Sequence, residues 1–270
     1  MTRTPRVVVL GCGPAGLIAA HTVRSLYSGE VICFSVKRPS DLYGCQYLHA
    51  PIPDTPGWDE DGQEVDYRLL GDTEVYRAKV YGSLTPPVSP EKYEGNHWAW
   101  DLRKTYSWLW ETYESCVQDV KVRPEDVKPM LAHLQPDLMV SSIPLPALCQ
   151  AGSRHTFQSV PCWALGDAPD RGQFVRDRFP IKPFTVLCNG SKDVSWYRLS
   201  NVFDYATVEW PGHKRKPPVE GVAEFRKPLS NDCDCLPDVL RVGRYGQWQK
   251  GVLSHETYER VVKAMGERGF

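Results

Sequence analysis

The sequence feature that most constrains the fold is a glycine-rich turn near the N-terminus. Residues 6–10 are the run Arg-Val-Val-Val-Leu, and Gly-Cys-Gly-Pro-Ala-Gly follows directly as residues 11–16. Small and apolar residues then dominate the next turns of the chain. This order predicts a buried parallel strand, a tight turn and a helix over residues 14–27.

The three glycines of this turn have the spacing Gly-x-Gly-x-x-Gly, which is typical of dinucleotide-binding proteins. Gly11 permits the sharp turn, Gly13 lets the backbone approach a pyrophosphate, and Gly16 lets the helix lie close to the strand. The N–H groups and the positive dipole end of the helix favour phosphate binding. We therefore expect Pro14 and Ala15, in the first turn of the helix, to belong to the same site.

The second strand of this unit is predicted over residues 30–36. An acidic residue usually ends such a strand and binds the ribose hydroxyls. Here that position falls near Ser35, no acid is present, and Lys37 and Arg38 follow. Two interpretations remain open. Either Ser35 binds the ribose with Lys37 or Arg38 near the adenosine, or the two cations bind the extra 2′-phosphate of NADP.

The bulk properties indicate a globular protein. The chain has 270 residues, a formal net charge of −1 and 41% hydrophobic residues, which fits one large core or two modest ones. The balanced charge predicts no general attraction to nucleic acid or to a membrane surface. No apolar run reaches the ~18 residues of a membrane span. The N-terminus enters the first strand rather than a signal peptide, so we expect a cytoplasmic protein.

Regular elements alternate with proline-rich segments along the rest of the chain. Alternating side chains predict a strand over residues 73–82, and aromatic residues at helical spacing predict a helix over 98–116. Residues 57–72 are polar and acidic and indicate a surface excursion. Further strands are expected over residues 117–122, 137–144, 184–188, 194–210 and 219–229, with a helix over 124–134.

The C-terminal stretch is the second informative part of the sequence. Residues 239–248 (Val-Leu-Arg-Val-Gly-Arg-Tyr-Gly-Gln-Trp) predict a buried strand that enters a glycine-rich turn. Lys-Gly-Val-Leu-Ser follows as residues 250–254. Ser254 is a suitable N-cap for an amphipathic helix over residues 254–265.

Together the two ends of the chain resemble FAD-dependent proteins built like UDP-galactopyranose mutase and the amine oxidases. The chain as a whole is similar to compact flavin-type oxidoreductases of actinobacterial phages, for which the compartment would be the host cytoplasm. The resemblance implies that Gly243 closes over the ribityl-pyrophosphate chain and that Arg244 binds the cofactor phosphates. It also implies that the N-terminus of the last helix faces the flavin pyrimidine, where a helix dipole stabilises the anionic reduced flavin.

Three more segments match these flavoproteins. The segment after the second strand wraps along the cofactor in them, so Gly44, Gln46 and His49 are candidates for flavin or substrate contact. Ser141 ends a strand that resembles the Asp-x-Val-Ile-x-Thr-x-Pro strand of amine-oxidase-like proteins. Arg198, in Ser-Trp-Tyr-Arg, resembles the arginine that mutase-type proteins place near the active site.

These observations define the candidate site residues. The candidate catalytic residues are Arg198, Gln46 and His49. The candidate cofactor-binding residues are Gly11, Gly13, Pro14, Ala15, Gly16, Ser35, Lys37, Gly44, Ser141, Gly243, Arg244, Gly251, Val252 and Leu253.

The expected fold class is α/β, a Rossmann-like FAD-binding fold with a smaller β-rich and aromatic cap region. The FAD-binding domain is expected to be discontinuous and to comprise residues 1–50, 115–148 and 236–270. Residues 51–114 and 149–235 are expected to form the cap and the substrate region.

The expected function is that of an FAD-dependent oxidoreductase, which transfers a hydride between a small or nucleotide-like substrate and flavin N5. One alternative is an NAD(P)-binding reductase that places Lys37 and Arg38 on a 2′-phosphate. Another is a flavin-dependent enzyme that modifies nucleotides or nucleic acids, which the basic residues 213–216 would favour. The expected partner is a small-molecule substrate, and the sequence sets no oligomeric state.

The cysteines raise the question of a metal. There are nine, an odd number, and their scatter argues against a secreted disulfide framework. Several soft ligands in one β-rich region are candidates for structural zinc. They are Cys149, Cys188, Cys233 and Cys235, with His155 and Cys162 nearby in the sequence. The alternative is that these cysteines are buried free thiols and that no metal binds.

Overall fold

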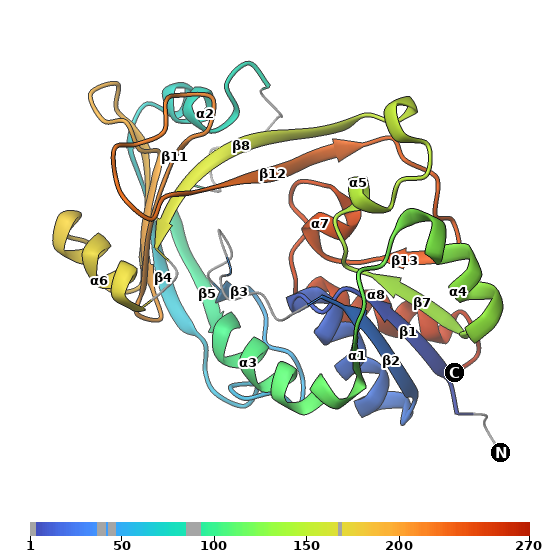
Figure 1. The fold of residues 1–270 in the computed structure, drawn as a ribbon. Helices are drawn as coiled ribbons and strands as arrows, with labels where there is room; N and C mark the ends of the chain where they lie inside the picture. The colour runs from blue at the N-terminus through green and yellow to red at the C-terminus, as the bar shows by residue number, and fades with distance from the viewer. Residues whose placement is uncertain (1–3, 37–41, 43–46, 85–92, 167–168) are drawn as a thin grey trace.

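A computed structural model describes residues 4–36, 42, 47–84, 93–166 and 169–270. The chain forms a parallel sheet with helices on both faces, beside a larger curled sheet (Figure 1). The five-stranded parallel sheet has the order β13-β7-β1-β2-β6. Its strands are β1 (Arg6–Leu10), β2 (Glu30–Ser35), β6 (Val117–Asp119), β7 (Leu138–Ser141) and β13 (Val239–Arg241). This architecture confirms the predicted α/β, Rossmann-like fold class.

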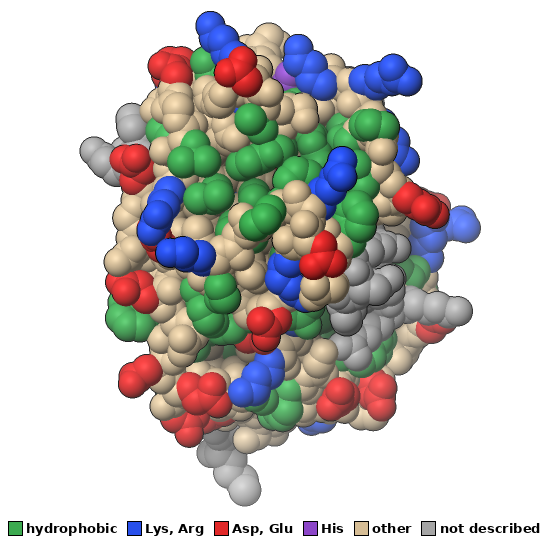
Figure 2. All heavy atoms as spheres, turned by 90° about the vertical axis from the view of Figure 1, so that its left-hand side faces the viewer, with side chains coloured by type: hydrophobic (Ala, Val, Ile, Leu, Met, Phe, Trp, Pro, Cys, Tyr) green, Lys and Arg blue, Asp and Glu red, His purple; other side chains and the backbone are tan. Residues whose placement is uncertain are grey.

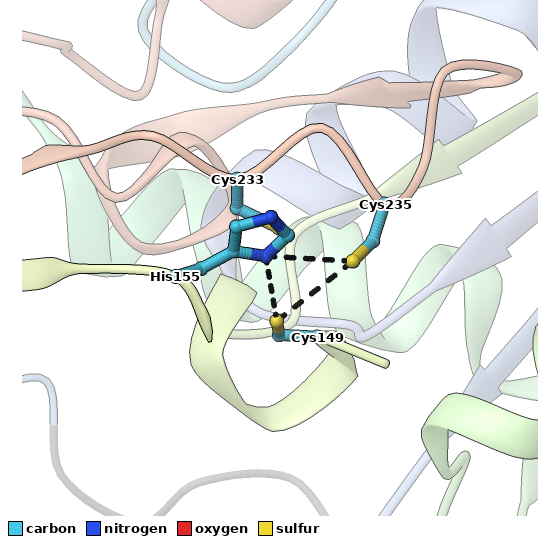
Figure 3. Close-up of side chains that lie close together, drawn as sticks. All are labelled: Cys149, His155, Cys233 and Cys235. Atoms are coloured by element: carbon cyan, nitrogen blue, oxygen red, sulfur yellow. Dashed lines mark hydrogen bonds between the residues drawn. The ribbon is translucent and has the colours of Figure 1, made fainter. Parts of the chain in front are cut away.

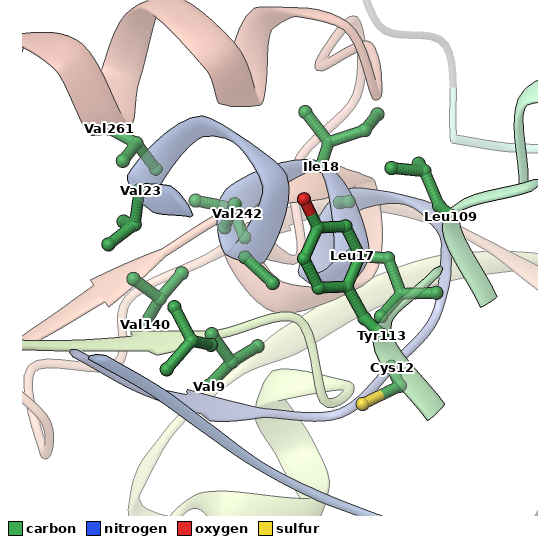
Figure 4. Close-up of a cluster of buried hydrophobic side chains, with 14 of the residues drawn as sticks. Val9, Cys12, Leu17, Ile18, Val23, Leu109, Tyr113, Val140, Val242 and Val261 are labelled. Atoms are coloured by element: carbon green, nitrogen blue, oxygen red, sulfur yellow. The ribbon is translucent and has the colours of Figure 1, made fainter. Parts of the chain in front are cut away.

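The alternation of side chains along β1 explains why helices cover both faces of this sheet. Val7 and Val9 point into one core, and Val8 and Leu10 point into another. The first core is closed by α1 (Pro14–Tyr27), α3 (Leu102–Tyr113) and α8 (Glu256–Gly266), whose buried side chains are drawn in part in Figure 4. The second is closed by α4 (Val127–Leu134) and α5 (Leu145–Leu148). Burial on both faces is what a parallel sheet requires.

The second sheet has eight strands in the order β12-β8-β11-β10-β9-β4-β5-β3. Its strands are β3 (Tyr47–Leu48), β4 (Gln63–Gly71), β5 (Gly95–Asp101), β8 (Phe157–Gly166), β9 (Thr185–Gly190), β10 (Arg198–Val202), β11 (Tyr205–Pro211) and β12 (Ala223–Asn231). β4 and β9 pair in parallel, and the other neighbouring strands of this sheet pair antiparallel within the described residues. The long pair β8 and β12 reaches from the curled sheet back toward the parallel sheet (Figure 1). Helix α6 (Pro169–Arg178) packs on β8 and β11.

Much of the predicted secondary structure is confirmed. The first strand and the first helix have the predicted bounds, residues 6–10 and 14–27. All five strands of the parallel sheet fall within residues 1–50, 115–148 and 236–270, the ranges proposed for the cofactor domain. Helix α3 lies outside those ranges, although it packs against α1.

The prediction of a strand over residues 73–82 is wrong, because these residues form helix α2 (Thr73–Tyr81). The carboxylate of Asp72 accepts a hydrogen bond from Val75 N and caps the helix. Tyr76 and Val80 are the buried residues of α2 and lie one turn apart. Residues 73–82 also alternate in polarity, so their pattern fits both a strand and a helix. The N-cap at Asp72 favours the helix.

Two neighbouring predictions also need correction. The helix expected over residues 98–116 begins only at Leu102, because Asp101 caps it by accepting from the N–H groups of Arg103 and Lys104. The preceding residues form β5, and Trp98 is 57% exposed rather than part of a buried stripe. Residues 57–72, expected as a surface excursion, contain β4.

The structure also bears on membrane insertion. Within the described part of the chain, no helix has both the length and the apolar character needed to cross a membrane.

Candidate functional site

The glycine-rich turn connects β1 to α1 and brings the two elements into close contact. Gly11 has φ +85°, in the region that favours glycine. A Cβ on Gly16 would lie 1.9 Å from the carbonyl oxygen of Gly11. Any side chain at residue 16 would therefore force the helix away from the strand.

Gly13 differs from its neighbours because it faces open space. It is the N-cap residue of α1, with Pro14 as the first helical residue. Among the described residues, no atom beyond Gly13 and its two chain neighbours lies within 4 Å of the position that a Cβ on Gly13 would take. The N-terminus of α1 thus presents backbone N–H groups to a space that a ligand can approach, which suits an anion.

Three side chains from other elements hold the turn in place. The hydroxyl of Ser142 donates to Gly11 O at 2.8 Å, and Tyr106 donates to Cys12 O at 2.9 Å. Ser35 Oγ accepts from Cys12 N at 3.1 Å. Ser35 is buried at the end of β2 and retains its own hydroxyl hydrogen to donate. Its predicted contact with a ribose stays a prediction.

The C-terminal segment lies against this turn, as the resemblance predicts for the two ends of the chain. It contains β13, the short helix α7 (Gly243–Gln247) and the loop that leads to α8. Gly243 has φ +67°, and a Cβ there would lie 2.7 Å from the Cβ of Ala15. Gly246 packs on the carbonyl oxygen of Ser141, so α7 also touches the end of β7. The sequence-predicted Gly243 and Ala15 are therefore neighbours in space.

The remaining C-terminal candidates form the loop after α7. Gly251 has φ +83° and, like Gly13, faces open space. Leu253 N donates to the carboxylate of Glu256 at 3.2 Å, which fixes the entry into α8. Val252 lies between them, half-buried. Ser141 is buried, and its Oγ has no hydrogen-bond partner among the described residues.

A group of histidine and tyrosine rings gathers between the curled sheet and the C-terminal segment. His49 follows β3, and its ring centroid lies 6.4 Å from that of His97 on β5 and 6.1 Å from that of His255 before α8. Tyr47 lies 4.7 Å from His49, and Tyr67 lies 4.8 Å from His97. We call these five residues the ring cluster. It brings together residues of the range 47–97 with His255 near the C-terminus.

The ring cluster keeps His49 neutral. Desolvation by the surrounding groups, together with the positive charges of His255, His97 and Arg244, lowers the pKa of His49 to about 4. Desolvation also lowers the pKa of His255. A neutral imidazole can both donate and accept hydrogen bonds at neutral pH. His49, predicted as catalytic, therefore has the chemistry of a hydrogen-bonding or proton-accepting group there.

Arg198, the second catalytic candidate that the structure describes, belongs to a buried ionic network in the curled sheet. It forms an ion pair with Glu209 of β11, and Lys227 of β12 contacts the same carboxylate at 2.5 Å. Burial raises the pKa of Glu209, but the charges of Arg198 and Lys227 outweigh it and hold that pKa at about 2. Arg198 Nε is buried without a hydrogen-bond partner among the described residues. The guanidinium thus keeps one unsatisfied donor.

Three of the candidates lie outside the described residues: Lys37, Gly44 and Gln46. The metal candidates separate into two places. Cys149, Cys233 and Cys235 meet His155 (Figure 3), and Cys188 lies on β9 in the core of the curled sheet.

Sequence reasoning missed the partners of these residues. His97 and His255 approach His49, and Tyr67 approaches His97, only because segments far apart in the sequence meet in space. In the same way Glu209 approaches Arg198 and Lys227 because β10, β11 and β12 belong to one sheet. The one local signal that could have found His97 is the alternating pattern of residues 95–101, which contains this histidine.

Comparisons with known proteins identify the class to which this fold belongs. The chain superposes on reduced UDP-galactopyranose mutase with a TM-score of 0.58 at 12% identity, covering 99% of this chain and 94% of that one. The tetrameric form of 2-methyl-3-hydroxypyridine-5-carboxylic acid oxygenase gives 0.54 at 10% identity, covering 99% and 82%. BrvH, a flavin-dependent halogenase from Brevundimonas sp. BAL3, gives 0.51 at 12% identity, covering 99% and 73%.

No protein-family model matches the sequence, and no curated protein sequence does either. The structural likeness therefore establishes the fold: a parallel five-stranded sheet and a curled mixed sheet, as in FAD-binding enzymes.

Proposed function

We propose that this protein is an FAD-dependent oxidoreductase acting on a small or nucleotide-like substrate. The observation that carries the proposal is the meeting of the two glycine-rich ends of the chain. Gly13 at the start of α1 and Gly251 after α7 both face open space, and Gly243 packs on Ala15 beside them. This arrangement offers a path for an extended dinucleotide along the carboxyl ends of the parallel strands.

The residues of this path fit the charge of the cofactor. The N-terminus of α1 would bind the pyrophosphate through backbone N–H groups, and Arg244 of α7 would neutralise it. Ser35 at the end of β2 would donate its hydroxyl to the ribose. When bound, FAD supplies the hydride chemistry at its N5 atom.

The ring cluster is the proposed place for the substrate. Neutral His49 would orient the substrate by a hydrogen bond and accept a proton from it where the reaction releases one. Arg198 lies in the curled sheet, as Tyr47, Tyr67 and His97 do. Its unsatisfied Nε–H would donate a hydrogen bond to an anionic or carbonyl group of the substrate. Tyr47 and Tyr67, hydrogen-bonded to each other at 2.5 Å, would exclude water from this side.

A specific observation keeps NADP as a second candidate cofactor. The second strand ends in Ser35 rather than in an acid, and Lys37 and Arg38 follow it. A thermal-shift titration with FAD and with NADPH separates the two. The proposal expects FAD to raise the melting temperature at lower ligand concentration than NADPH does. A larger shift with NADPH would favour the NAD(P)-dependent reductase instead.

The charge on the face shown in Figure 2 does not favour a nucleic-acid substrate. Residues 213–216 are exposed in the turn after β11, where a solvated basic turn is expected. On the face shown in Figure 2, basic and acidic side chains are interspersed. A nucleic-acid groove usually concentrates basic charge, so we propose a small-molecule partner.

A further inference from the structure

Four metal-ligating side chains converge where the curled sheet joins the parallel sheet. Cys149 follows α5 and His155 precedes β8, whereas Cys233 and Cys235 lie between β12 and β13. Their ligand atoms all lie within 4.8 Å of one another (Figure 3). Two stretches far apart in the sequence thus contribute two ligands each.

The separations between these atoms fit one tetrahedral ion. Cys149 Sγ lies 3.9 Å from Cys235 Sγ, and His155 Nδ1 lies 3.2 Å from the first sulfur and 3.5 Å from the second. Around tetrahedral zinc, the usual bond lengths place two sulfurs about 3.8 Å apart and a sulfur and a nitrogen about 3.6 Å apart. No large rearrangement is therefore needed for an ion to enter.

The other nitrogen of His155 has the partner expected of a metal ligand. His155 Nε2 lies 3.3 Å from Oδ1 of Asp234, whose side chain is 93% exposed. Metal-bound histidines usually donate their second N–H to a carboxylate, which fixes the ring and its tautomer. Here that contact leaves Nδ1 free to face the three cysteines.

Hydrogen bonds between backbone and side chains order the ligand-bearing stretches, and one of them joins the two stretches directly. Thr156 N donates to the carboxylate of Asp232 at 2.7 Å, and Cys233 N donates to Asn231 Oδ1 at 3.0 Å. Arg241 donates to the carbonyl oxygen of Cys233 at 3.1 Å. The loop of residues 231–235 is thus ordered around the cluster by contacts that do not use the sulfur atoms.

We propose that Cys149, His155, Cys233 and Cys235 bind one zinc(II) ion in a structural site. Three thiolates and one imidazole in tetrahedral arrangement are a donor set typical of zinc. Four protein ligands leave no open position for water or substrate, so the site is structural rather than catalytic. On binding, the three thiols release their protons to solvent and zinc takes their place.

The position of the site gives it a role in the architecture. The chain leaves the parallel sheet for the curled sheet through Cys149 and His155, and returns through Cys233 and Cys235 (Figure 1). One ion bound to all four residues fastens the outgoing and the returning connection to each other. The zinc would thereby fix the base of β8 and β12, whatever cofactor the parallel sheet binds.

Elemental analysis by mass spectrometry tests the proposal. The full-length protein is purified without chelator and with a cleavable tag that contains no histidines. We expect one zinc per chain, retained on dialysis and released after mercurial modification of the thiols. Less than a tenth of an equivalent of zinc, or a Cys149–Cys235 disulfide found in non-reduced peptides, would overturn the proposal.

Matched variants locate the ion. Cys235→Ser and His155→Gln are expected to lose zinc and to melt at a lower temperature, whereas Cys116→Ser, outside the cluster, keeps a full equivalent. If the zinc-site variants do not fold, cobalt(II) replaces zinc in the wild-type chain. Visible bands of tetrahedral thiolate-bound cobalt would then support the site, and their absence would count against it.

Asp234 would position the ring of His155, and zinc affinity measures this role separately. Asp234→Asn is expected to keep one zinc per chain but to bind it about 10- to 100-fold more weakly in a chelator competition. Unchanged affinity would show that the second nitrogen of His155 has no part in the site.

Discussion

At the scale of single residues, the glycines of the first turn divide into two kinds. Gly16 is needed for packing, because its missing side chain lets α1 lie on Gly11 O. Gly13 has no packing role, because the position of its absent Cβ is open. Gly13 lies at the N-terminus of α1, where such a glycine leaves room for the proposed phosphate ligand, whereas Gly266 has the same open surroundings at the C-terminal end of α8.

The two kinds of glycine predict different effects of substitution. Gly13→Asp is expected to fold, because Gly13 has φ −69° and open space. It is expected to weaken FAD binding at least tenfold, about 1.4 kcal/mol, because a carboxylate would face the pyrophosphate. Flavin fluorescence titration measures this. The control is Gly266→Asp at the exposed C-terminal end of α8, where no atom of the described residues comes within 4 Å of the Cβ position either. Equal losses in both variants would contradict the assignment.

His49 predicts a pH dependence. Its folded-state pKa of about 4 lies below the ordinary value of 6.5, so the unfolded chain takes up this proton first as the pH falls. The contribution of His49 to the free energy of unfolding is therefore full above pH 6.5 and decreases as the pH falls toward 4. NMR titration of labelled imidazoles should find a resonance with that low pKa, absent in His49→Asn. An ordinary pKa for His49 would show that the ring cluster is open to water.

At the scale of elements, the sequence predicts a helix or strand correctly where the residues of that element alone determine its structure. The aliphatic run of β1 and the glycine turn predict β1 and α1 with their bounds, because burial and turn geometry are encoded in consecutive residues. The strand predicted over residues 73–82 is wrong because the alternation of Tyr76, Ala78 and Val80 also suits a helix, in which Tyr76 and Val80 share a face. The Asp72 cap contains the deciding information, and sequence reasoning did not use it.

The ionic network predicts how β10, β11 and β12 depend on one another. Glu209→Gln removes the carboxylate that pairs with both Arg198 and Lys227 and leaves these two largely buried cations with no other ion-pair partner among the described residues. We expect a loss of about 3 to 5 kcal/mol in the free energy of unfolding, measured by urea denaturation. Glu224→Gln, exposed on β12, is the matched control and should change little. A small effect at residue 209 would mean that water screens the network.

At the scale of the whole molecule, the sequence could predict the class of fold but not the composition of the site. The glycine turns at the two ends predict the parallel sheet and the proposed dinucleotide path. The ring cluster and the four proposed zinc ligands depend on how distant strands pair across the curled sheet. The sequence analysis named Cys149 and Cys235 as zinc candidates together with Cys188, but only the three-dimensional arrangement shows which of these ligands meet. No local pattern relates His49 to His255.

The most direct test of the central claim is the flavin content of the purified protein. Heat-released ligand is identified by mass spectrometry, and the remaining protein is titrated with FAD while flavin absorbance and fluorescence are followed. The account predicts that FAD either co-purifies or binds on addition, to a total of one equivalent per chain. A folded protein that shows no flavin absorbance and binds no added FAD would contradict it.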